Sequence, residues 1–177
     1  MKIGICGKMC SGKSTLAKQI KDYINSENKD IQIDAFANKI YEIAYALFNM
    51  KEKDRKLLQS IGTKFREIDE NVWVNYIINK YNSTENINDV IIDDVRYKNE
   101  LDTLKENGYI LIKLNISEEL QIQRLKELYK DSFQIHYDNM NHSSENELNL
   151  VSNDLFDIII DVDKFHPFEI IKTKLLF

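Results

Sequence analysis

The chain of 177 residues contains only one proline, five glycines and two cysteines. Cys6 and Cys10 have neither the spacing of a zinc site nor that of a disulfide framework, which favours a reducing cytoplasm. No hydrophobic run approaches the length of a membrane span and no cleavable signal is visible, so we expect no membrane partner. A chain of this length predicts a single domain with its own core.

Among the charged residues, arginine is scarce and the balance is negative. The 24 lysines and arginines are outnumbered by 29 acidic residues, and the net charge of -5 argues against DNA or RNA as a main partner. The only arginines are Arg55, Arg66, Arg96 and Arg124. Each one either marks a position that needs a planar, bidentate cation or is simply a rare residue, and the sequence leaves both interpretations open.

Two of the few glycines occupy fixed positions of one motif. Residues 7–14 read GKMCSGKS, which matches G-x-x-x-x-G-K-[ST] between an apolar strand at 1–6 and an amphipathic helix from about residue 14. Gly7 and Gly12 allow backbone conformations in which successive N–H groups point inward. The pattern therefore predicts a phosphate-binding loop for a nucleoside triphosphate.

Each position of this loop has a chemical role in that prediction. Lys13 supplies a cation for the β- and γ-phosphates, and the Ser14 hydroxyl can bind Mg²⁺. The unpaired N–H groups at the start of the following helix add further donors. The predicted phosphate-binding residues are Gly7, Lys8, Cys10, Ser11, Gly12, Lys13, Ser14 and Thr15.

Strand and helix patterns alternate along the rest of the chain. The remaining strands are expected at 31–34, 90–94, 109–114 and 156–160, and helices at 36–49, 57–68, 72–81, 97–107, 117–129 and from 167 onward. Residues 131–142 are expected to be irregular. The alternation predicts an α/β, three-layer P-loop fold with a five-stranded parallel sheet flanked by helices.

Carboxylates follow two of these strands, at the edge where parallel sheets bind ligands. Asp93 and Asp94 end one strand, and a carboxylate there can hold Mg²⁺ or orient a phosphate acceptor. Arg96 is placed to grip a second phosphate, unless it forms a surface ion pair. Asp34 is a weaker substrate candidate, with a helix N-cap as the alternative.

A polar face is predicted on the helix at 57–68. Gln59, Thr63 and Arg66 lie at i, i+4 and i+7, so they can read a base and its phosphate, or form a solvated face. Gly62 either breaks this helix or lets a ligand approach closely.

Two further side-chain types are candidates. Arg124 follows the pattern of a lid arginine that clamps the transferred phosphoryl group, or it pairs with Glu127. Phe36 and Trp73 can stack on a base, although core packing is the better default for both.

Four blocks together resemble the phage-type deoxynucleoside monophosphate kinases, a branch of the P-loop nucleoside monophosphate kinases. They are GKMCSGKST at 7–15, LLQSIGTKFREIDENVWV at 57–74, VIIDDVRYKNE at 90–100 and HSSE at 142–145. The resemblance implies a viral origin and one kinase domain over 1–177, with substrate-binding helices at about 36–81 and a lid at about 117–145. It also implies Mg²⁺-dependent transfer of the γ-phosphoryl group of ATP to a deoxynucleoside 5′-monophosphate.

The resemblance also suggests residue roles, combined here with those from strand position. The substrate-binding set is Asp34, Phe36, Gln59, Thr63, Arg66, Asp94, Arg96, Glu100, His142 and Glu145. The catalytic set is Lys13, Asp94, Arg96 and Arg124, and Mg²⁺ is assigned to Ser14 and Asp93. Departures from the family pattern at Asn38, Tyr41 and Met140 leave the choice of base open, and the oligomeric state, with a homodimer possible, is also open.

Two other classes of protein fit parts of the sequence. Another small-molecule P-loop kinase, similar to dephospho-coenzyme A kinase, would suit Asp34 and Arg124. A non-catalytic nucleotide-binding module would need only the loop. A GTPase switch is disfavoured because the sequence contains neither an Asp-x-x-Gly nor an Asn-Lys-x-Asp element.

Overall fold

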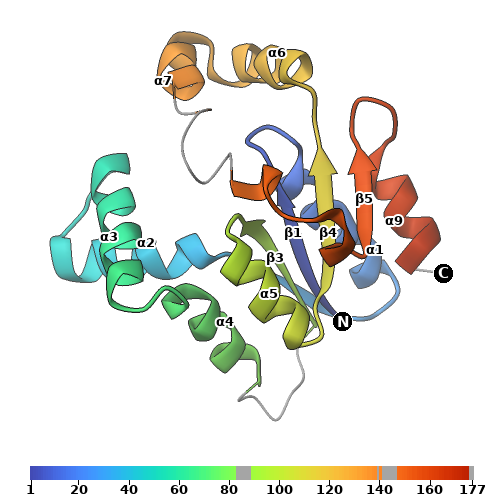
Figure 1. Cartoon of the computed structure of the whole chain (residues 1–177), viewed down its shortest axis with the longest axis horizontal. Helices are drawn as coiled ribbons and strands as arrows, with labels where there is room; N and C mark the ends of the chain where they lie inside the picture. Colours follow the sequence, from blue (N-terminus) through green and yellow to red (C-terminus); the bar gives the residue numbers. More distant parts are fainter. Residues whose placement is uncertain (83–88, 139, 141–146, 176–177) are drawn as a thin grey trace.

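A computed structural model of the chain describes residues 1–82, 89–138, 140 and 147–175 (Figure 1). Its centre is a parallel sheet with strand order β2-β3-β1-β4-β5. The strands are β1 (Lys2–Gly7), β2 (Ile31–Asp34), β3 (Asp89–Val95), β4 (Ile110–Asn115) and β5 (Ile158–Asp161). The predicted α/β fold with five parallel strands is confirmed, and β1 leads into the glycine-containing loop from the middle of the sheet.

Helices connect the strands at nearly the predicted places. They are α1 (Lys13–Ser26), α2 (Phe36–Phe48), α3 (Arg55–Ile68), α4 (Val72–Asn82), α5 (Lys98–Glu106), α6 (Glu118–Tyr129), α7 (Phe133–Asp138) and α9 (Pro167–Leu175). Short 3-10 helices lie at η1 (Lys130–Ser132), η3 (Glu147–Asn149) and η4 (Asn153–Leu155). Within the described ranges, no helix is long and apolar enough to span a bilayer.

One expectation about local structure was wrong, and one alternative is excluded. The segment after α6 is helical over residues 133–138, because aromatic side chains at helical spacing pack there, with the rings of Phe133 and Tyr137 5.5 Å apart. Gly62 does not break its helix, since α3 continues through it. Gly108 follows the end of α5 with a φ of 77°, the left-handed conformation that is common for a glycine just after a helix.

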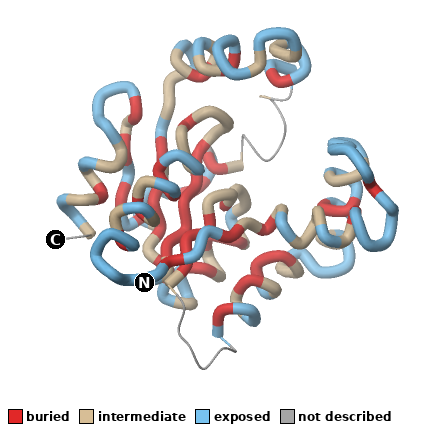
Figure 2. The backbone as a smooth tube through the Cα atoms, turned by 180° about the vertical axis from the view of Figure 1, so that it is seen from behind, coloured by how far each residue is buried: buried red, intermediate tan, exposed pale blue. Residues whose placement is uncertain are grey.

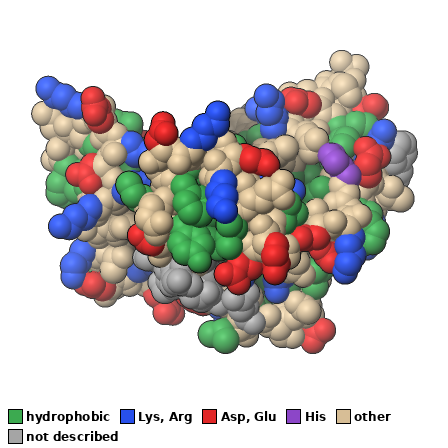
Figure 3. Space-filling view, turned by 90° about the horizontal axis from the view of Figure 1, so that it is seen from above, with side chains coloured by type: hydrophobic (Ala, Val, Ile, Leu, Met, Phe, Trp, Pro, Cys, Tyr) green, Lys and Arg blue, Asp and Glu red, His purple; other side chains and the backbone are tan. Residues whose placement is uncertain are grey.

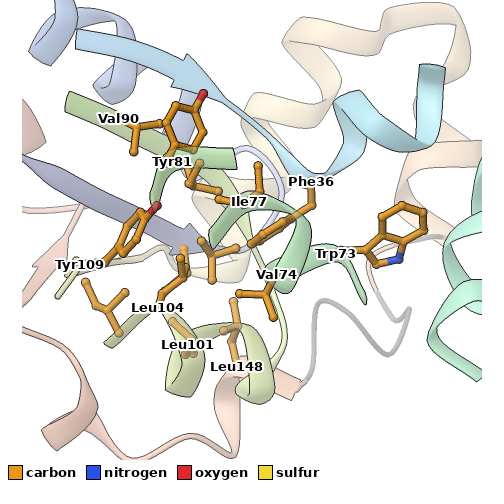
Figure 4. Close-up of a cluster of buried hydrophobic side chains, with 14 of the residues drawn as sticks. Phe36, Trp73, Val74, Ile77, Tyr81, Val90, Leu101, Leu104, Tyr109 and Leu148 are labelled. Carbon is orange, nitrogen blue, oxygen red and sulfur yellow. The ribbon is translucent and has the colours of Figure 1, made fainter. Parts of the chain in front are cut away.

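The strands of the sheet are largely buried (Figure 2), and apolar side chains cover both of its faces, as expected for parallel strands. Alternation along β3 sends Val90 and Ile92 to one face and Ile91 to the other. The first face packs with α4 and α5 through residues such as Ile77 and Leu101 (Figure 4). The opposite face packs with α1 and α9, whose apolar residues include Leu16, Ile20 and Ile171.

Two segments extend beyond this layered core (Figure 1). Helices α2 and α3 project from one side of the sheet, and α6 and α7 lie above the carboxyl ends of the strands. Both segments therefore flank the edge at which the glycine-containing loop emerges.

The α2–α4 segment is anchored to the sheet by a buried carboxylate at the end of β2. Asp34 is 5% exposed and accepts hydrogen bonds from Ala35 N (2.8 Å), Asn38 Nδ2 (2.8 Å), Lys80 Nζ (2.7 Å) and the Tyr81 hydroxyl (2.8 Å). Burial acts to raise the pKa of Asp34, but these hydrogen bonds, led by that from Lys80, lower it below its usual value. Four internal donors occupy this carboxylate, so the role that the structure shows for Asp34 is that of an anchor, and its substrate contact stays a prediction.

Candidate active site

The loop between β1 and α1 has the backbone that its sequence predicts. Gly7 and Gly12 have φ values of 151° and 96°, and Cys10, at 63°, also lies in the left-handed region. A Cβ on Gly7 would come within 2.7 Å of both the Leu114 carbonyl oxygen and Ser11 Oγ. The loop can therefore close only with glycine at that position.

Two polar side chains in the loop are arranged toward its interior. Lys13 Nζ donates to the carbonyl oxygens of Gly7 (2.8 Å) and Lys8 (2.9 Å), so the ammonium group folds back across the loop. The Ser11 hydroxyl is buried, and within the described part of the chain it has no hydrogen-bond partner. Glycines at positive φ, a folded-back lysine and an orphaned hydroxyl suit the bound phosphate group of a nucleotide.

A cavity of about 820 Å³ opens beside this loop, and we call it the loop cavity. Three segments line it, namely the loop with the first turns of α1, the end of α6 and the turn before α9. Its lining residues are Cys10, Ser11, Gly12, Lys13, Ser14, Thr15, Leu16, Gln19, Arg124, Glu127, Leu128, Tyr129, Val162, Asp163, Lys164, Phe165, His166 and Pro167.

Helix α6 is hydrogen-bonded directly to the loop. Arg124 Nη1 donates to the Cys10 carbonyl oxygen (2.9 Å), and Gln121 Nε2 donates to the Met9 carbonyl oxygen (3.0 Å). The alternative pairing of Arg124 with Glu127 was wrong, because Glu127 accepts from Gln123 Nε2 instead (3.0 Å). Arg124 thus holds a permanent cation at the rim of the loop cavity.

A second cavity of about 420 Å³ lies on the other side of the loop, and we call it the arginine cavity. Its lining residues are Met9, Phe36, Ala37, Ile40, Tyr41, Lys53, Arg55, Leu58, Gln59, Gly62, Thr63, Arg66, Asp94, Arg96, Tyr97, Glu100, Tyr129 and His136. It brings together seven of the residues that the sequence assigned to the substrate: Phe36, Gln59, Thr63, Arg66, Asp94, Arg96 and Glu100. The two cavities meet at the loop, where Met9 lines one and Cys10 the other.

The concentration of cations in the arginine cavity is local. Lys53, Arg55, Arg66 and Arg96 all line it, although the chain as a whole carries a net charge of -5. On the surface seen from above, basic and acidic side chains are interspersed (Figure 3). The cavity is therefore suited to an anionic ligand by its own lining rather than by the charge of the whole protein.

Arg66 and Glu100 form an ion pair at the wall of this cavity. Arg66 Nη2 lies 3.1 Å from Glu100 Oε1, and the Arg66 guanidinium lies 4.3 Å from the centroid of the Tyr97 ring. Glu100 Oε2 accepts from the backbone N–H groups of Arg96 (2.9 Å) and Tyr97 (3.1 Å). Burial raises the pKa of Glu100, against the opposing effects of the Arg96 N–H and of Arg66.

Asp94 serves α2 as a capping group supplied by β3. Its two carboxylate oxygens accept from the backbone N–H groups of Phe36 and Ala37, each at 2.9 Å. Burial raises the pKa of Asp94 to about 7, although these two hydrogen bonds lower it. Both oxygens hold the N-terminus of α2, so the role that the structure shows for Asp94 is that of an anchor at the cavity wall, and its catalytic and substrate contacts stay predictions.

The predicted polar face of α3 points into the arginine cavity. Gln59, Thr63 and Arg66 all line it, as do Gly62 and Arg55 on the same helix. A Cβ on Gly62 would lie 3.4 Å from Ile40 Cδ1 and 3.5 Å from Arg66 Nη1, which are ordinary contact distances, so the packing of Arg66 does not require a glycine there.

The aromatic residues divide between core and cavity. Trp73 is 2% exposed, donates from Nε1 to the Gly62 carbonyl oxygen (3.2 Å) and stacks on Phe65 at 5.4 Å, so the preferred core interpretation is confirmed. Phe36 is buried in the same core, yet its side of α2 also lines the arginine cavity.

A stacked group that the sequence did not reveal links α6 and α7 to α3. The rings of Tyr129 and His136 are stacked with centroids 3.5 Å apart, and Arg55 Nη2 lies 3.1 Å from His136 Nε2. Burial, followed by the nearby Arg55 and Lys53, lowers the pKa of His136, so the imidazole favours the neutral form. Two features of the sequence could have indicated this group. They are the helical spacing of the aromatic residues after residue 130 and the rarity of arginine.

Other assigned residues lie elsewhere. Asp93, the predicted Mg²⁺ ligand, lines neither cavity, whereas Ser14 lines the loop cavity. His142 and Glu145 lie outside the described residues. Among residues that are described, no group of three or more His, Cys, Asp or Glu side chains could hold a metal ion.

The fold and the loop define an α/β protein with a P-loop kinase-like architecture. A family model described as an AAA domain matches residues 3–146, and the chain therefore belongs to this family. A search of curated proteins found no match.

Solved structures share the fold over almost the whole chain. A shikimate kinase from Aquifex aeolicus has 19% identity and a TM-score of 0.55, with 99% of this chain and 94% of that chain covered. A sugar kinase from Janibacter sp. has 15% identity and a TM-score of 0.58, with 99% and 92% covered. An uncharacterised protein from Eubacterium ventriosum has 17% identity and a TM-score of 0.58, with 98% and 96% covered.

Proposed function

We propose that this protein is a kinase that transfers the γ-phosphoryl group of ATP to a deoxynucleoside 5′-monophosphate. The observation that carries the proposal is the pair of adjoining cavities, one beside a phosphate-binding loop and one containing Arg66 and Arg96. The four-block resemblance to phage-type deoxynucleoside monophosphate kinases supplies the acceptor class. Kinases among the structural neighbours support the reaction type.

The chemistry of the arginine cavity favours a phosphate acceptor over an alcohol. Asp94 and Glu100 are the only carboxylates among its described lining residues, and protein donors already occupy both. An alcohol acceptor benefits from a general base, whereas an ionised phosphate oxygen needs none. Arginine guanidinium groups match phosphate oxygens in geometry as well as in charge.

The loop cavity suits the donor. In the proposed complex, Lys13 Nζ turns from the carbonyl oxygens of Gly7 and Lys8 to the β- and γ-phosphates. The Ser14 hydroxyl would hold Mg²⁺, which would supply positive charge to neutralise the phosphate groups of the nucleotide. The glycines and the orphaned Ser11 hydroxyl are consistent with that fit.

Catalysis would rest on position and electrostatics. Arg124 would move from the Cys10 carbonyl oxygen toward the passing phosphoryl group, while Arg66 and Arg96 hold the acceptor. Tyr129 lines both cavities, so the end of α6 can change position when a ligand binds in either of them. A closed α6–α7 segment would exclude water and suppress hydrolysis of ATP.

We also propose that residues 1–177 act as one kinase domain in the cytoplasm.

A coupled assay of ADP release tests the proposal with a panel of deoxynucleoside monophosphates, ribonucleoside monophosphates, dephospho-coenzyme A and shikimate. We expect ADP to appear only with a monophosphate acceptor, together with an equal amount of the corresponding diphosphate by chromatography. Turnover with dephospho-coenzyme A alone would favour the rival kinase class. Acceptor-independent binding of ATP without any turnover would favour a non-catalytic module.

A further inference from the structure

Glu100 holds a position in the arginine cavity that differs from direct substrate contact. It is 2% exposed, lies in the first turn of α5, and uses both carboxylate oxygens within the protein. One oxygen pairs with Arg66 Nη2 at 3.1 Å, and the other accepts the backbone N–H groups of Arg96 and Tyr97. A single buried carboxylate therefore joins the two arginines proposed to bind the acceptor.

Arg66 is fixed on three sides by this arrangement. Besides Glu100, its guanidinium contacts the Gly62 carbonyl oxygen through Nη1 (3.3 Å) and lies over the Tyr97 ring. An arginine side chain that samples many rotamers loses conformational entropy when it binds a phosphate. Holding the guanidinium in place before the ligand arrives removes most of that cost.

Arg96 is fixed through its main chain. The hydrogen bonds from Arg96 N (2.9 Å) and Tyr97 N (3.1 Å) to Glu100 Oε2 set the turn between β3 and α5. This turn determines the direction in which the Arg96 side chain leaves the end of the strand. The same carboxylate therefore holds both Arg66 on α3, through its side chain, and Arg96 after β3, through its backbone.

Charge gives a second reason for the pairing. The Glu100 carboxylate neutralises part of the charge of the four cations that line the cavity, so Arg66 is not left as an uncompensated, partly buried charge. A carboxylate in direct contact with an acceptor phosphate would instead repel it.

We infer that Glu100 is a positioning residue, which holds Arg66 and Arg96 in the geometry that binds the acceptor phosphate and does not itself touch the acceptor. This inference rests on the proposed function. It replaces the substrate contact that family resemblance implies for Glu100.

A double-mutant cycle tests the inference with Glu100→Gln, Arg66→Met and the combined variant. We expect Glu100→Gln to reduce kcat/KM for the monophosphate by about 10- to 100-fold, mainly through KM, while KM for ATP stays within about twofold. In the Arg66→Met background, the same change should cost less than about threefold, because its main target is absent. The inference would be overturned if Glu100→Gln reduced kcat/KM by the same factor in both backgrounds. An equal rise in KM for the monophosphate and for ATP would also overturn it.

A matched control lies on the same helix. Asp102 pairs with Lys98 on the surface of α5, outside both cavities, so Asp102→Asn should leave both KM values unchanged. A monophosphate KM that rises as much in Asp102→Asn as in Glu100→Gln would show a general effect of α5, and would also overturn the inference.

Thermal unfolding provides a readout that needs no substrate. Glu100→Gln should lower the melting temperature of the wild type, but raise that of Arg66→Met, where the buried carboxylate has lost its partner. If no monophosphate is phosphorylated by the wild type, the proposed function fails, whereas this reversal of sign still tests whether Glu100 and Arg66 act as a pair. No reversal would overturn the inference.

If Glu100→Gln does not fold, Arg66→Lys supplies the kinetic test. Lysine keeps the charge beside Glu100 but loses the planar fork that the carboxylate orients. We expect KM for the monophosphate to rise about tenfold with KM for ATP unchanged. An unchanged monophosphate KM would overturn the inference.

Discussion

The two cavities are built in different ways. The loop cavity takes much of its lining from consecutive residues of the loop and the start of α1, whereas the arginine cavity draws on α2, α3, the end of β3, α5 and α7. A short motif with glycines at fixed positions determines most of the geometry of the loop by itself. The second cavity exists only after distant segments have packed, so it is the part of the molecule whose geometry no short motif determines.

The two cavities also differ in how they present positive charge. The loop offers backbone N–H groups and one lysine at the N-terminus of a helix, and the second cavity offers arginine side chains held by a buried carboxylate. Substitutions on the two sides should therefore affect different kinetic constants.

The largest effect is expected from Lys13→Ala, on the loop side. Loss of the cation that serves the transferred phosphoryl should reduce kcat by about 1000-fold. Isothermal titration should still show the monophosphate binding with an affinity within about twofold of the wild type. A parallel loss of monophosphate binding would mean that the two cavities do not work separately.

Arg96→Lys tests the opposite side. The substitution keeps the charge but loses bidentate geometry, so KM for the monophosphate should rise about tenfold and kcat should fall. KM for ATP serves as the internal control and should not change. Kinetics identical to those of the wild type would remove Arg96 from the acceptor site.

Asp94→Asn examines the anchor beneath the arginine cavity. The pKa of Asp94 is about 7 in the folded protein and about 3.8 in an unfolded chain, so the folded state binds more protons between these values. The unfolding free energy of the wild type should therefore gain, as pH falls from 7 to 5, a contribution of about 1 kcal/mol per pH unit from this group.

Urea denaturation of both proteins at several pH values measures this contribution. The difference between wild type and Asp94→Asn isolates it from the other carboxylates, including Asp34, whose pKa is lowered and whose contribution has the opposite sign. An unfolding free energy that depends on pH with the same slope in both proteins would show that folding does not shift the pKa of Asp94.

The smallest effect is expected from His136→Phe. Phenylalanine can still stack on Tyr129 but cannot contact Arg55 through a ring nitrogen, so KM for the monophosphate should rise about twofold to threefold.

In the wild type, the same contact should depend on pH. The pKa of His136 is lowered on folding, so its stabilising contribution is present above about pH 6.5 and is lost as pH falls through the lower, folded value. KM for the monophosphate should rise in that range for the wild type, but not for His136→Phe. A rise of equal size in both proteins would assign the pH dependence to another group.

The sequence predicted the parts of the molecule that depend on local pattern. Strand and helix periodicity located the sheet, and the spacing in residues 7–14 located the loop. Gln59, Thr63 and Arg66 were placed together because helical spacing puts them on one face.

What the sequence did not predict depends on contacts between distant segments. Asp94 caps a helix that begins 58 positions earlier in the chain, and Arg55 meets His136 across 81 positions. No spacing rule relates residues so far apart, and a carboxylate at a strand end fits a metal ligand, a substrate contact and a cap equally well. Only the packed structure distinguishes these roles.

The anchoring of α2–α4 has a mechanical consequence. Asp34 and Asp94 grip residues 35–38 from neighbouring strands, while the far ends of α2 and α3 stand away from the sheet (Figure 1). This attachment holds the segment at its base, while the contact of Arg55 with His136 joins its outer part to α7. A small rotation at residues 34–37 would therefore displace Gln59 and Arg55 together with the contact to α7, so the width of the entrance to the arginine cavity depends on the bonds at the base and on this one contact.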